Sequence, residues 1–115
     1  MQEITIDATL QALIPPMGEE ERAMLEQNVL EHGCRDPLVT WRGVLLDGHN
    51  RYAICQKHGI EFRTVQMEFD STEQARVWMR NNQMGRRNLT PAWRLELQLA
   101  NKDDLAKIGA AKRVE

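Results

Sequence analysis

The residues Gly48-His49-Asn50-Arg51 have the composition of a phosphate-binding turn. The apolar run Val44–Leu46 before them predicts a strand, and the residues after them predict a helix. The start of a helix offers free backbone N–H groups to an anion, and Gly48 allows the backbone to approach it closely. Arg51 can grip two phosphate oxygens at once, and His49 and Asn50 add further donors. The alternative is a turn without a ligand, because strand-to-helix turns often combine a glycine with a polar cap.

A second polar run, NNQMGRRNLTP at positions 81–91, separates two expected helices. Asn82 and Gln83 can donate to phosphate or help to hold a hydrated Mg²⁺ ion, and Arg86 and Arg87 add positive charge. The alternative is a helix end followed by a solvated turn. A third run, HGCRDPLV at positions 32–39, joins an expected helix to a strand and by itself indicates no ligand.

Charge is distributed unevenly along the 115 residues, whose formal net charge is −2. Residues 1–70 carry 12 acidic and 6 basic side chains, whereas residues 71–115 carry 5 acidic and 9 basic ones. The basic part contains a group of arginines that could attract phosphate: Arg76, Arg80, Arg86, Arg87 and Arg94. The alternative is a solvated helix face, since arginine is common at protein surfaces.

The composition fits one globular domain, with 42% hydrophobic and 28% charged residues. No apolar run approaches the roughly 18 residues that span a bilayer. The N-terminus lacks the pattern of a signal peptide, and Cys34 and Cys55 have no spaced partners, which together predict reduced thiols in a cytoplasmic protein. His32, His49 and His58 show no zinc-ligand spacing with either cysteine, so no metal site is expected.

Periodicity and turn residues predict an α+β fold, in which a small sheet with interspersed helices is followed by helices alone. The expected strands are Ile4–Ile6, Pro37–Trp41, Val44–Leu46 and part of Ile60–Phe69 with Phe62, Val65 and Met67 as apolar positions. Arg42-Gly43 should turn the middle two strands into a hairpin. The expected helices run from Glu19 to Gly33, from His49 to His58, from Asp70 to a break at Gly85–Asn88, from Pro91, and more weakly from Lys102.

Particular side chains should define the ends and buried faces of these helices. Asp70 is expected to cap the third helix with Glu73 reaching back, and Thr90 to cap the next one with Pro91 in its first turn. The expected core positions are Met24, Leu25, Val29 and Leu30, then Ala75, Trp78 and Met79, then Leu95, Leu97 and Leu99. Residues 91–112 read as two helices joined near 101–104 without a glycine-containing turn, which argues against a helix-turn-helix there.

Taken in order, the three polar runs resemble the N-terminal domain of the ParB family, within the ParB/sulfiredoxin superfamily. The resemblance extends from about Ile14 to Ala100 and implies a small mixed sheet packed with helices. The run EHGCRDPLVTW is similar to the family's Gly-Ile-x-Gln-Pro box, and Gly48 and Arg51 match the ends of its Gly-Glu-Arg-Arg box. Leu89-Thr90-Pro91 resembles the helix start that follows the family's second phosphate box.

This resemblance implies a site for CTP, or another nucleoside triphosphate, with Mg²⁺. The residues that it places at the phosphates are Gly48, His49, Asn50, Arg51, Asn82, Gln83, Arg86 and Arg87, and those near the base are Gly33, Arg35, Asp36 and Pro37. Asp36 replaces the family's glutamine, which weakens the expectation of cytosine selectivity. The glutamate of the second box is missing, which argues for weak hydrolysis or none.

Enzymatic activity is therefore an alternative and not the main expectation. His49 stands where sulfiredoxins carry their catalytic cysteine, which argues against that chemistry. A Mg²⁺-dependent nucleotide hydrolase or DNase is one alternative, although a nuclease usually needs two or more carboxylates and only Asp36 and Asp47 adjoin the boxes. A scaffold that has lost ligand binding is the other alternative, because His49 and Asn50 both depart from the family's box.

The resemblance also implies the setting of the chain, a chromosome or plasmid partition protein of bacterial or phage type. Residues 1–88 are expected to form the nucleotide-binding core, and residues 89–115 a helical extension that leads to a helix-turn-helix domain outside this chain. The expected partners are DNA, through the full-length protein, a second copy in a homodimer, and a partner ATPase. No membrane association is expected.

Overall fold

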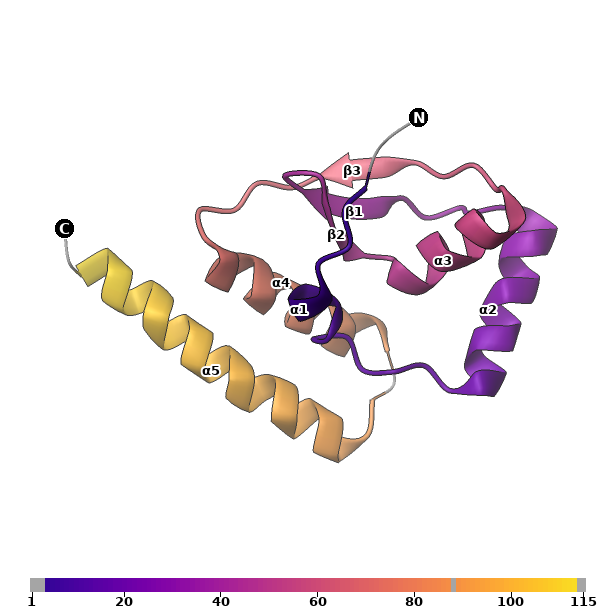
Figure 1. The fold of residues 1–115 in the computed structure, drawn as a ribbon. Coiled ribbons are helices and arrows are strands. Elements are labelled where there is room, and N and C mark those ends of the chain that lie inside the picture. Colours follow the sequence, from indigo (N-terminus) through magenta and orange to yellow (C-terminus); the bar gives the residue numbers. More distant parts are fainter. Residues whose placement is uncertain (1–3, 88, 114–115) are drawn as a thin grey trace. The chain divides into compact units, whose positions relative to one another are not determined.

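The computed structural model describes residues 4–87 and 89–113 (Figure 1). Contacts group the chain into two compact units. One comprises the chain up to Gln11 together with Pro16–Glu68, and the other comprises Ala12–Pro15 together with the chain from Phe69 onward. The division at residue 88 that the sequence suggested stays a prediction.

The first unit contains a three-stranded mixed sheet in the order β2-β1-β3. Strand β1 (Leu38–Trp41) pairs antiparallel with β2 (Val44–Asp47) and parallel with β3 (Thr64–Gln66). Arg42 and Gly43 have φ values of 53° and 78°, and a hairpin turn with two positive φ values matches the twist of the strands it joins. The Arg42 guanidinium lies 4.8 Å from the ring centroid of Trp41. The predicted hairpin is confirmed, and with it the α+β fold.

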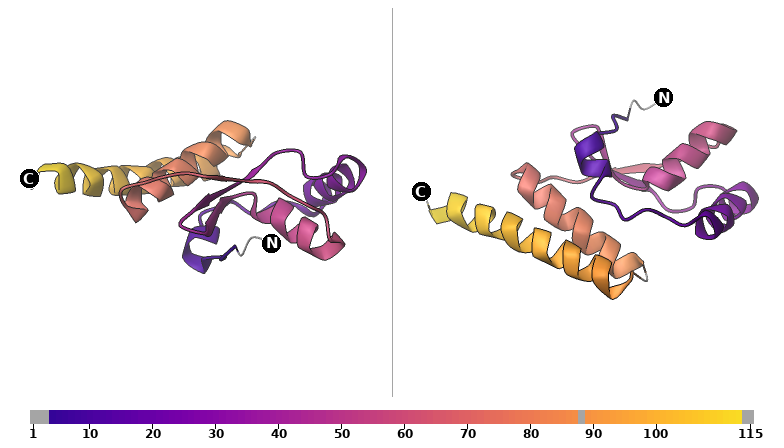
Figure 2. Two further views of the ribbon diagram at one scale, coloured as in Figure 1. Left: turned by 90° about the horizontal axis from the view of Figure 1, so that it is seen from above. Right: turned by 60° about the horizontal axis from the view of Figure 1, so that its bottom comes forward.

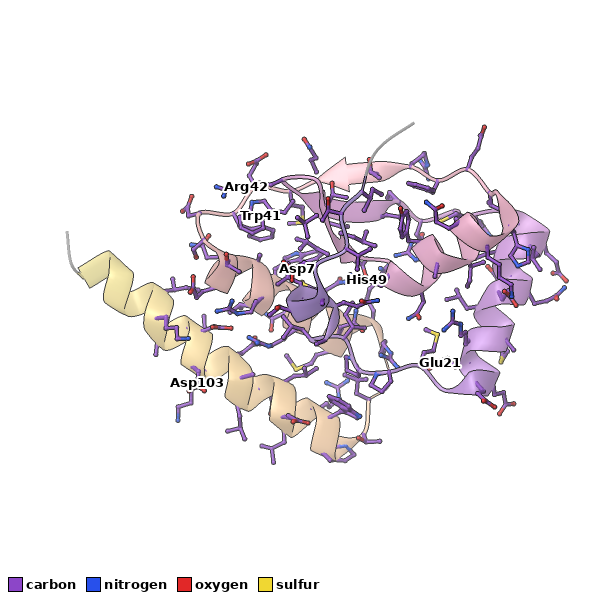
Figure 3. The ribbon with its side chains drawn as sticks, viewed as in Figure 1. Asp7, Glu21, Trp41, Arg42, His49 and Asp103 are labelled. Atoms are coloured by element: carbon purple, nitrogen blue, oxygen red, sulfur yellow. The ribbon has the colours of Figure 1, made fainter. Side chains whose placement is uncertain are left out.

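The N-terminal segment is less regular than the sequence predicts. The strand expected at Ile4–Ile6 is reduced to one parallel bridge, in which the Thr5 amide donates to the Gly43 carbonyl. A short helix that the sequence analysis missed follows it, α1 (Ala8–Gln11). Asp7 Oδ1 accepts hydrogen bonds from two backbone amides in the first turn of α1, those of Thr9 and Leu10 (Figure 3). The cap satisfies orphan N–H groups of the first turn.

Two helices of the first unit, α2 (Glu19–His32) and α3 (His49–His58), lie next to each other (Figure 1). A small core of Val29, Ile54 and Cys55 fills the space between them, with Leu25, Cys34, Ile60 and Phe62 packed around it. The prediction that Met24 and Leu30 face the core is wrong, because the exposed fraction of the surface is 68% for Met24 and 48% for Leu30. One narrow stripe of α2 is enough to cover the short α3. The expected strand between Ile60 and Phe69 shrinks to β3, where Val65 is exposed.

The second unit is built on α4 (Thr72–Arg86) and α5 (Pro91–Arg113), which run side by side in opposite directions (Figure 2). The cap of α4 is displaced by one residue from the prediction. Ser71, with an extended backbone, accepts the Gln74 amide at 3.2 Å, and Gln74 Oε1 accepts the Asp70 amide at 2.9 Å. Ser71 is therefore the N-cap, and the Gln74 side chain reaches back to the amide of the residue before the cap, where a capping box would bond the amide of the cap itself.

Helix α4 ends within the break predicted at Gly85–Asn88, whereas α5 passes through the break predicted near 101–104. Helix α4 continues through Gly85 and ends at Arg86, and α5 is one continuous helix capped by Thr90. The polar run at 101–104 does not interrupt α5, because Asn101 and Asp104 are buried and bond to side chains of α4. Leu97 is buried as expected, whereas Leu95 and Leu99 are more than half exposed. No helix among the described residues has the length and apolar character to cross a membrane.

Candidate nucleotide-binding site

A cavity of about 330 Å³ opens in the first unit between the end of α2 and the start of α3. Its lining comprises Leu25, Asn28, Val29, Gly33, Cys34, Arg35, Asp36 and Arg51. The loop 33–36 and the guanidinium of Arg51 thus border one space. Two of the three polar runs singled out in the sequence meet there, although they are separated by a strand hairpin in the chain. The volume lies at the lower end of the range for ligand sites, about 300–1,000 Å³.

Arg51 is held at this cavity by two hydrogen bonds. Its Nη1 donates to the backbone carbonyl of Asp36 at 2.8 Å, and its Nη2 donates to Asp47 Oδ2 at 3.3 Å. Only 12% of the Arg51 side chain and 8% of the Asp47 side chain are exposed, so the pair is well shielded from water. The guanidinium is consequently pre-oriented at the cavity wall, and its charge is already partly balanced by a carboxylate.

Gly48 is required by the backbone and by packing. It lies in the left-handed region, with φ 101° and ψ 25°, directly before the first residue of α3. A Cβ at this position would collide with Leu38 Cδ2 of the buried strand β1 and would come within 3.2 Å of Arg51 Nη2. The glycine therefore permits close contact between the turn, the sheet and the arginine. This requirement exists whether or not a ligand binds.

His49 is the first residue of α3 and is only 8% exposed (Figure 3). Both ring nitrogens are buried, and neither has a hydrogen-bond partner among the described residues. Burial lowers the pKa of His49, an effect that the nearby Asp47 carboxylate partly opposes. The ring is therefore neutral near pH 7 and carries one N–H donor. Because the first turn of α3 contains no acidic residue, its backbone N–H groups face no side-chain anion of their own turn.

The loop 33–36 is fixed through its backbone. Gly33 caps α2 with φ 77°, and its amide donates to the Val29 carbonyl. The Arg35 carbonyl accepts from Arg63 Nη2 at 2.6 Å, just as the next carbonyl accepts from Arg51. Sequence reasoning missed Arg63, since nothing local links a strand-flanking arginine to a loop 28 positions earlier. The side chains of Arg35 and Asp36 remain exposed, and Pro37 is half-buried before β1.

The other predicted phosphate contacts lie in the second unit, three of them in α4 and the fourth, Arg87, at its C-cap. Asn82 Nδ2 and Gln83 Oε1 are buried, and neither has a hydrogen-bond partner within residues 4–87 and 89–113. Of these two atoms, the Asn82 nitrogen can donate a hydrogen bond to phosphate, whereas the Gln83 oxygen can only accept one. Arg87 donates to the Pro15 carbonyl, and Arg86 is exposed on the last turn of α4. Their expected convergence with Gly48–Arg51 stays a prediction.

The arginine group of the second unit is smaller than the sequence indicates. Arg76 and Arg80 both bond to Asp104 of α5, the former through Nε at 3.0 Å and Nη2 at 2.8 Å. These hydrogen bonds, led by that of Arg76, lower the pKa of Asp104 to about 2. Arg94 Nη2 donates to the Met84 carbonyl at 3.1 Å. Arg76 and Arg80 therefore hold the two helices together, and they are not part of an open phosphate-attracting surface.

Comparison with known proteins shows which fold this arrangement represents. The structure of the C2221 form of the pNOB8-like ParB N-domain matches 96% of this chain with a TM-score of 0.79 and 29% identity. A second pNOB8-like ParB N-domain structure matches 97% with a TM-score of 0.75 and 26% identity. The fold is that of a ParB N-terminal domain. The predicted resemblance and the fold class are both confirmed.

The ParB-like domain spans 45% and 42% of the two solved chains, so less than half of either. No family model matches the sequence. No curated protein matches it either. The similarity is thus established through the fold together with modest sequence identity, and the site residues are described from their own geometry.

Proposed function

We propose that this ParB N-domain-like chain binds a nucleoside triphosphate, CTP in the first instance, with Mg²⁺ in a protein of the partition type. The observation that carries the proposal is the start of α3, where the buried imidazole of His49 has no partner among the described residues. A buried donor without an acceptor destabilises a fold by about 1–3 kcal/mol. A phosphate at the start of α3 would accept from that ring and from the free backbone N–H groups.

Arg51, which lies in the same first turn of α3, supports the same proposal. Its guanidinium lies at the wall of the cavity and is kept in place by Asp36 and Asp47. An arginine that is pre-oriented loses little side-chain entropy when it binds phosphate oxygens. Any Mg²⁺ would arrive with the phosphates, since Mg²⁺ in such sites keeps several waters and few protein ligands.

The chemistry of the loop 33–37 suits a nucleotide whose base carries an exocyclic amino group. Asp36 borders the cavity with an exposed carboxylate, which at neutral pH accepts hydrogen bonds and donates none. The exocyclic amino groups of cytosine, adenine and guanine are donors that a carboxylate can accept, whereas uracil has no exocyclic amino group. The replacement of the family's glutamine by Asp36 thus disfavours UTP. The family resemblance keeps CTP as the first candidate, with ATP and GTP as its competitors.

DNA binding belongs to the proposed whole protein. The two solved structures are named as ParB N-domains, and this chain covers less than half of each. We assign to the described residues the nucleotide-binding part. Contacts with DNA, a second copy or a partner ATPase would then respond to the nucleotide, as expected for a partition protein.

The paired state of Arg51 favours one alternative, a scaffold domain that no longer binds nucleotide. In that case the Asp47–Arg51 pair serves only to fasten α3 to the turn before it. Hydrolysis of the nucleotide, or cleavage of DNA, is a separate alternative that turnover measurements address.

The test is the melting temperature of the chain with Mg²⁺ and millimolar CTP, ATP, GTP or UTP. A nucleotide at about 100 times its Kd stabilises the fold by about 2.7 kcal/mol, which raises the melting temperature by several degrees. We expect CTP, ATP or GTP to give this shift and Arg51→Ala to remove it. Arg22→Ala, an exposed arginine of α2, is the matched control and should retain the shift.

Three outcomes separate the candidates. A shift with CTP, ATP or GTP and without phosphate release supports binding alone. Release of phosphate that disappears in Arg51→Ala supports the hydrolase. The absence of a shift with all four nucleotides overturns the proposal and leaves the scaffold.

A further inference from the structure

Two cysteine thiols from separate parts of the first unit meet beside the cavity. Cys55, on the second turn of α3, is 1% exposed and belongs to the core of Val29 and Ile54. Cys34, in the loop after α2, is half-buried and packs against this same core. The two residues therefore form a dithiol pair.

The pair is connected to the cavity through Cys34. Cys34 is one of the lining residues, and its Sγ donates to the Asp36 carbonyl at 3.6 Å. The same carbonyl oxygen accepts the Nη1 hydrogen bond of Arg51 at 2.8 Å. Arg51 and Cys55 are also four residues apart on α3, so they lie on one face of that helix. A change in the state of the thiols would therefore reach the loop carbonyl that positions Arg51.

The two thiols differ in access. Burial raises the pKa of Cys55 to about 11, and the neighbouring Cys34 contributes to the increase. Cys55 is consequently a protonated, enclosed thiol, whereas Cys34 is reachable from the cavity. A reagent in solution meets Cys34 first.

We propose that Cys34 and Cys55 are a redox modification site that reacts with small disulfides of the glutathione type. The Cys34 thiolate attacks one sulfur of the small disulfide, whose S–S bond breaks, and a mixed disulfide forms while one small thiol leaves. Cys55 then gives up its proton and attacks the Cys34 sulfur, which expels the second small thiol and joins Cys34 to Cys55. The two cysteines are oxidised by two electrons, and the small disulfide is reduced to two thiols that take up both protons.

The bond would change the wall of the cavity. Cys34 would lose the S–H group that donates to the Asp36 carbonyl. The loop 33–36 would be tied covalently to α3 in place of a weak thiol contact. An effect of this change on nucleotide binding rests on the proposed function. The formation of the Cys34–Cys55 bond does not depend on it.

The test uses the whole chain, first reduced and freed of reductant, then treated with excess glutathione disulfide under native conditions. We expect both thiols to disappear together, with an intact mass lower by two hydrogens and no attached glutathione. Digestion should yield one peptide pair joined through Cys34 and Cys55. Cys55→Ser should instead retain one glutathione on Cys34, and Cys34→Ser should stay unmodified. Cys55→Ala replaces Cys55→Ser if the hydroxyl prevents folding.

Two results would overturn the inference. One is a wild-type chain that keeps glutathione on Cys34 without forming the internal bond. The other is a chain in which both thiols stay free, or link two chains, under oxidation that fully modifies the urea-unfolded protein.

A second measurement keeps this inference separate from the nucleotide proposal. The nucleotide-induced shift in melting temperature is compared between the reduced and the internally bonded chain, and a different shift is expected. If the reduced chain shows no shift with any nucleotide, the proposed function fails while the mass measurement still decides the modification site.

Discussion

Asp104 should be the most pH-sensitive support of the α4–α5 pair, and Asp104→Asn is the variant that tests it. The carboxylate accepts three hydrogen bonds, two from Arg76 and one from Arg80. Its side chain is 6% exposed, and that of Arg80 is 8% exposed. The amide of asparagine keeps the size of the side chain but removes the charge. Arg80 then loses the carboxylate to which it is bonded in a shielded place, and Arg76 keeps only the longer ion pair with Glu73 at 3.6 Å.

The size of the effect follows from the pKa and from the burial. The pKa of Asp104 falls from 3.8 to about 2 because of the two arginines, which corresponds to about 2 kcal/mol of stabilisation by the ionised form. The loss of the buried Arg80 partner adds to this, so we expect Asp104→Asn to lower the free energy of unfolding by about 2–4 kcal/mol at pH 7. Because the folded-state pKa is depressed, the contribution is complete above the unfolded value. It is lost as the pH falls from 3.8 toward 2.

Urea unfolding of the wild type and of two variants, measured from pH 7 down to pH 2, checks this reasoning. Asp103→Asn is the matched control, because Asp103 is the adjacent residue and is exposed on α5 (Figure 3). It should change the free energy by less than about 0.5 kcal/mol. The gap between wild type and Asp104→Asn should narrow below pH 4. Equal stabilities for the two variants at pH 7, or a gap that stays constant to pH 2, would refute the role assigned to Asp104.

Three further substitutions test individual contacts by chemical unfolding. Gly48→Ala should lower the free energy of unfolding by about 2–4 kcal/mol, because the new Cβ is strained by the positive φ and collides with Leu38. Gly59 also has a positive φ but no atoms within 4 Å of a Cβ, so Gly59→Ala should cost only about 1 kcal/mol. Equal costs for the two variants would contradict the collision. Ser71→Ala should lose about 1 kcal/mol and Asp70→Ala should change little, because the Ser71 hydroxyl is the cap; the reverse order would restore the capping predicted from sequence. His49→Phe should leave the free energy of unfolding unchanged or raise it by about 1 kcal/mol, because it removes buried nitrogens that have no partner. The same variant should reduce the nucleotide-induced shift in melting temperature. A large loss of stability would point to a partner for the ring.

Local signals in the sequence were sufficient where neighbouring residues decide the structure. Gly33 ends α2, the Arg42-Gly43 turn makes the hairpin, and Thr90 caps α5 as predicted. In each case the residues that fix the backbone lie within about four positions of it, so composition and spacing carry the information. The order of the polar runs was also sufficient to identify the ParB-like fold.

Partners distant in sequence account for the errors. The run at 101–104 looks like a helix break, yet Asp104 is an interior residue because two arginines of α4 surround it. The same pairing removes Arg76 and Arg80 from the basic surface that the sequence indicates. Arg63, which fixes the loop 33–36, has no local signature at all. A polar side chain is assigned to the surface by default, and only its tertiary partner reveals that it is buried.

The residues of Gly48–Arg51 therefore carry unequal weight in the question of a ligand. Gly48 is needed for packing on Leu38, and Arg51 is needed to hold Asp36 and Asp47, so a fold without any ligand would keep both. The presence of Gly48 and Arg51 alone therefore does not distinguish a nucleotide site from a turn without a ligand. His49 departs from the box, but it is the side chain whose buried nitrogens have no use within the described structure. If the domain bound no ligand, an apolar ring at this position would make the fold more stable than histidine does. His49 is therefore the residue that distinguishes a nucleotide site from a turn without a ligand.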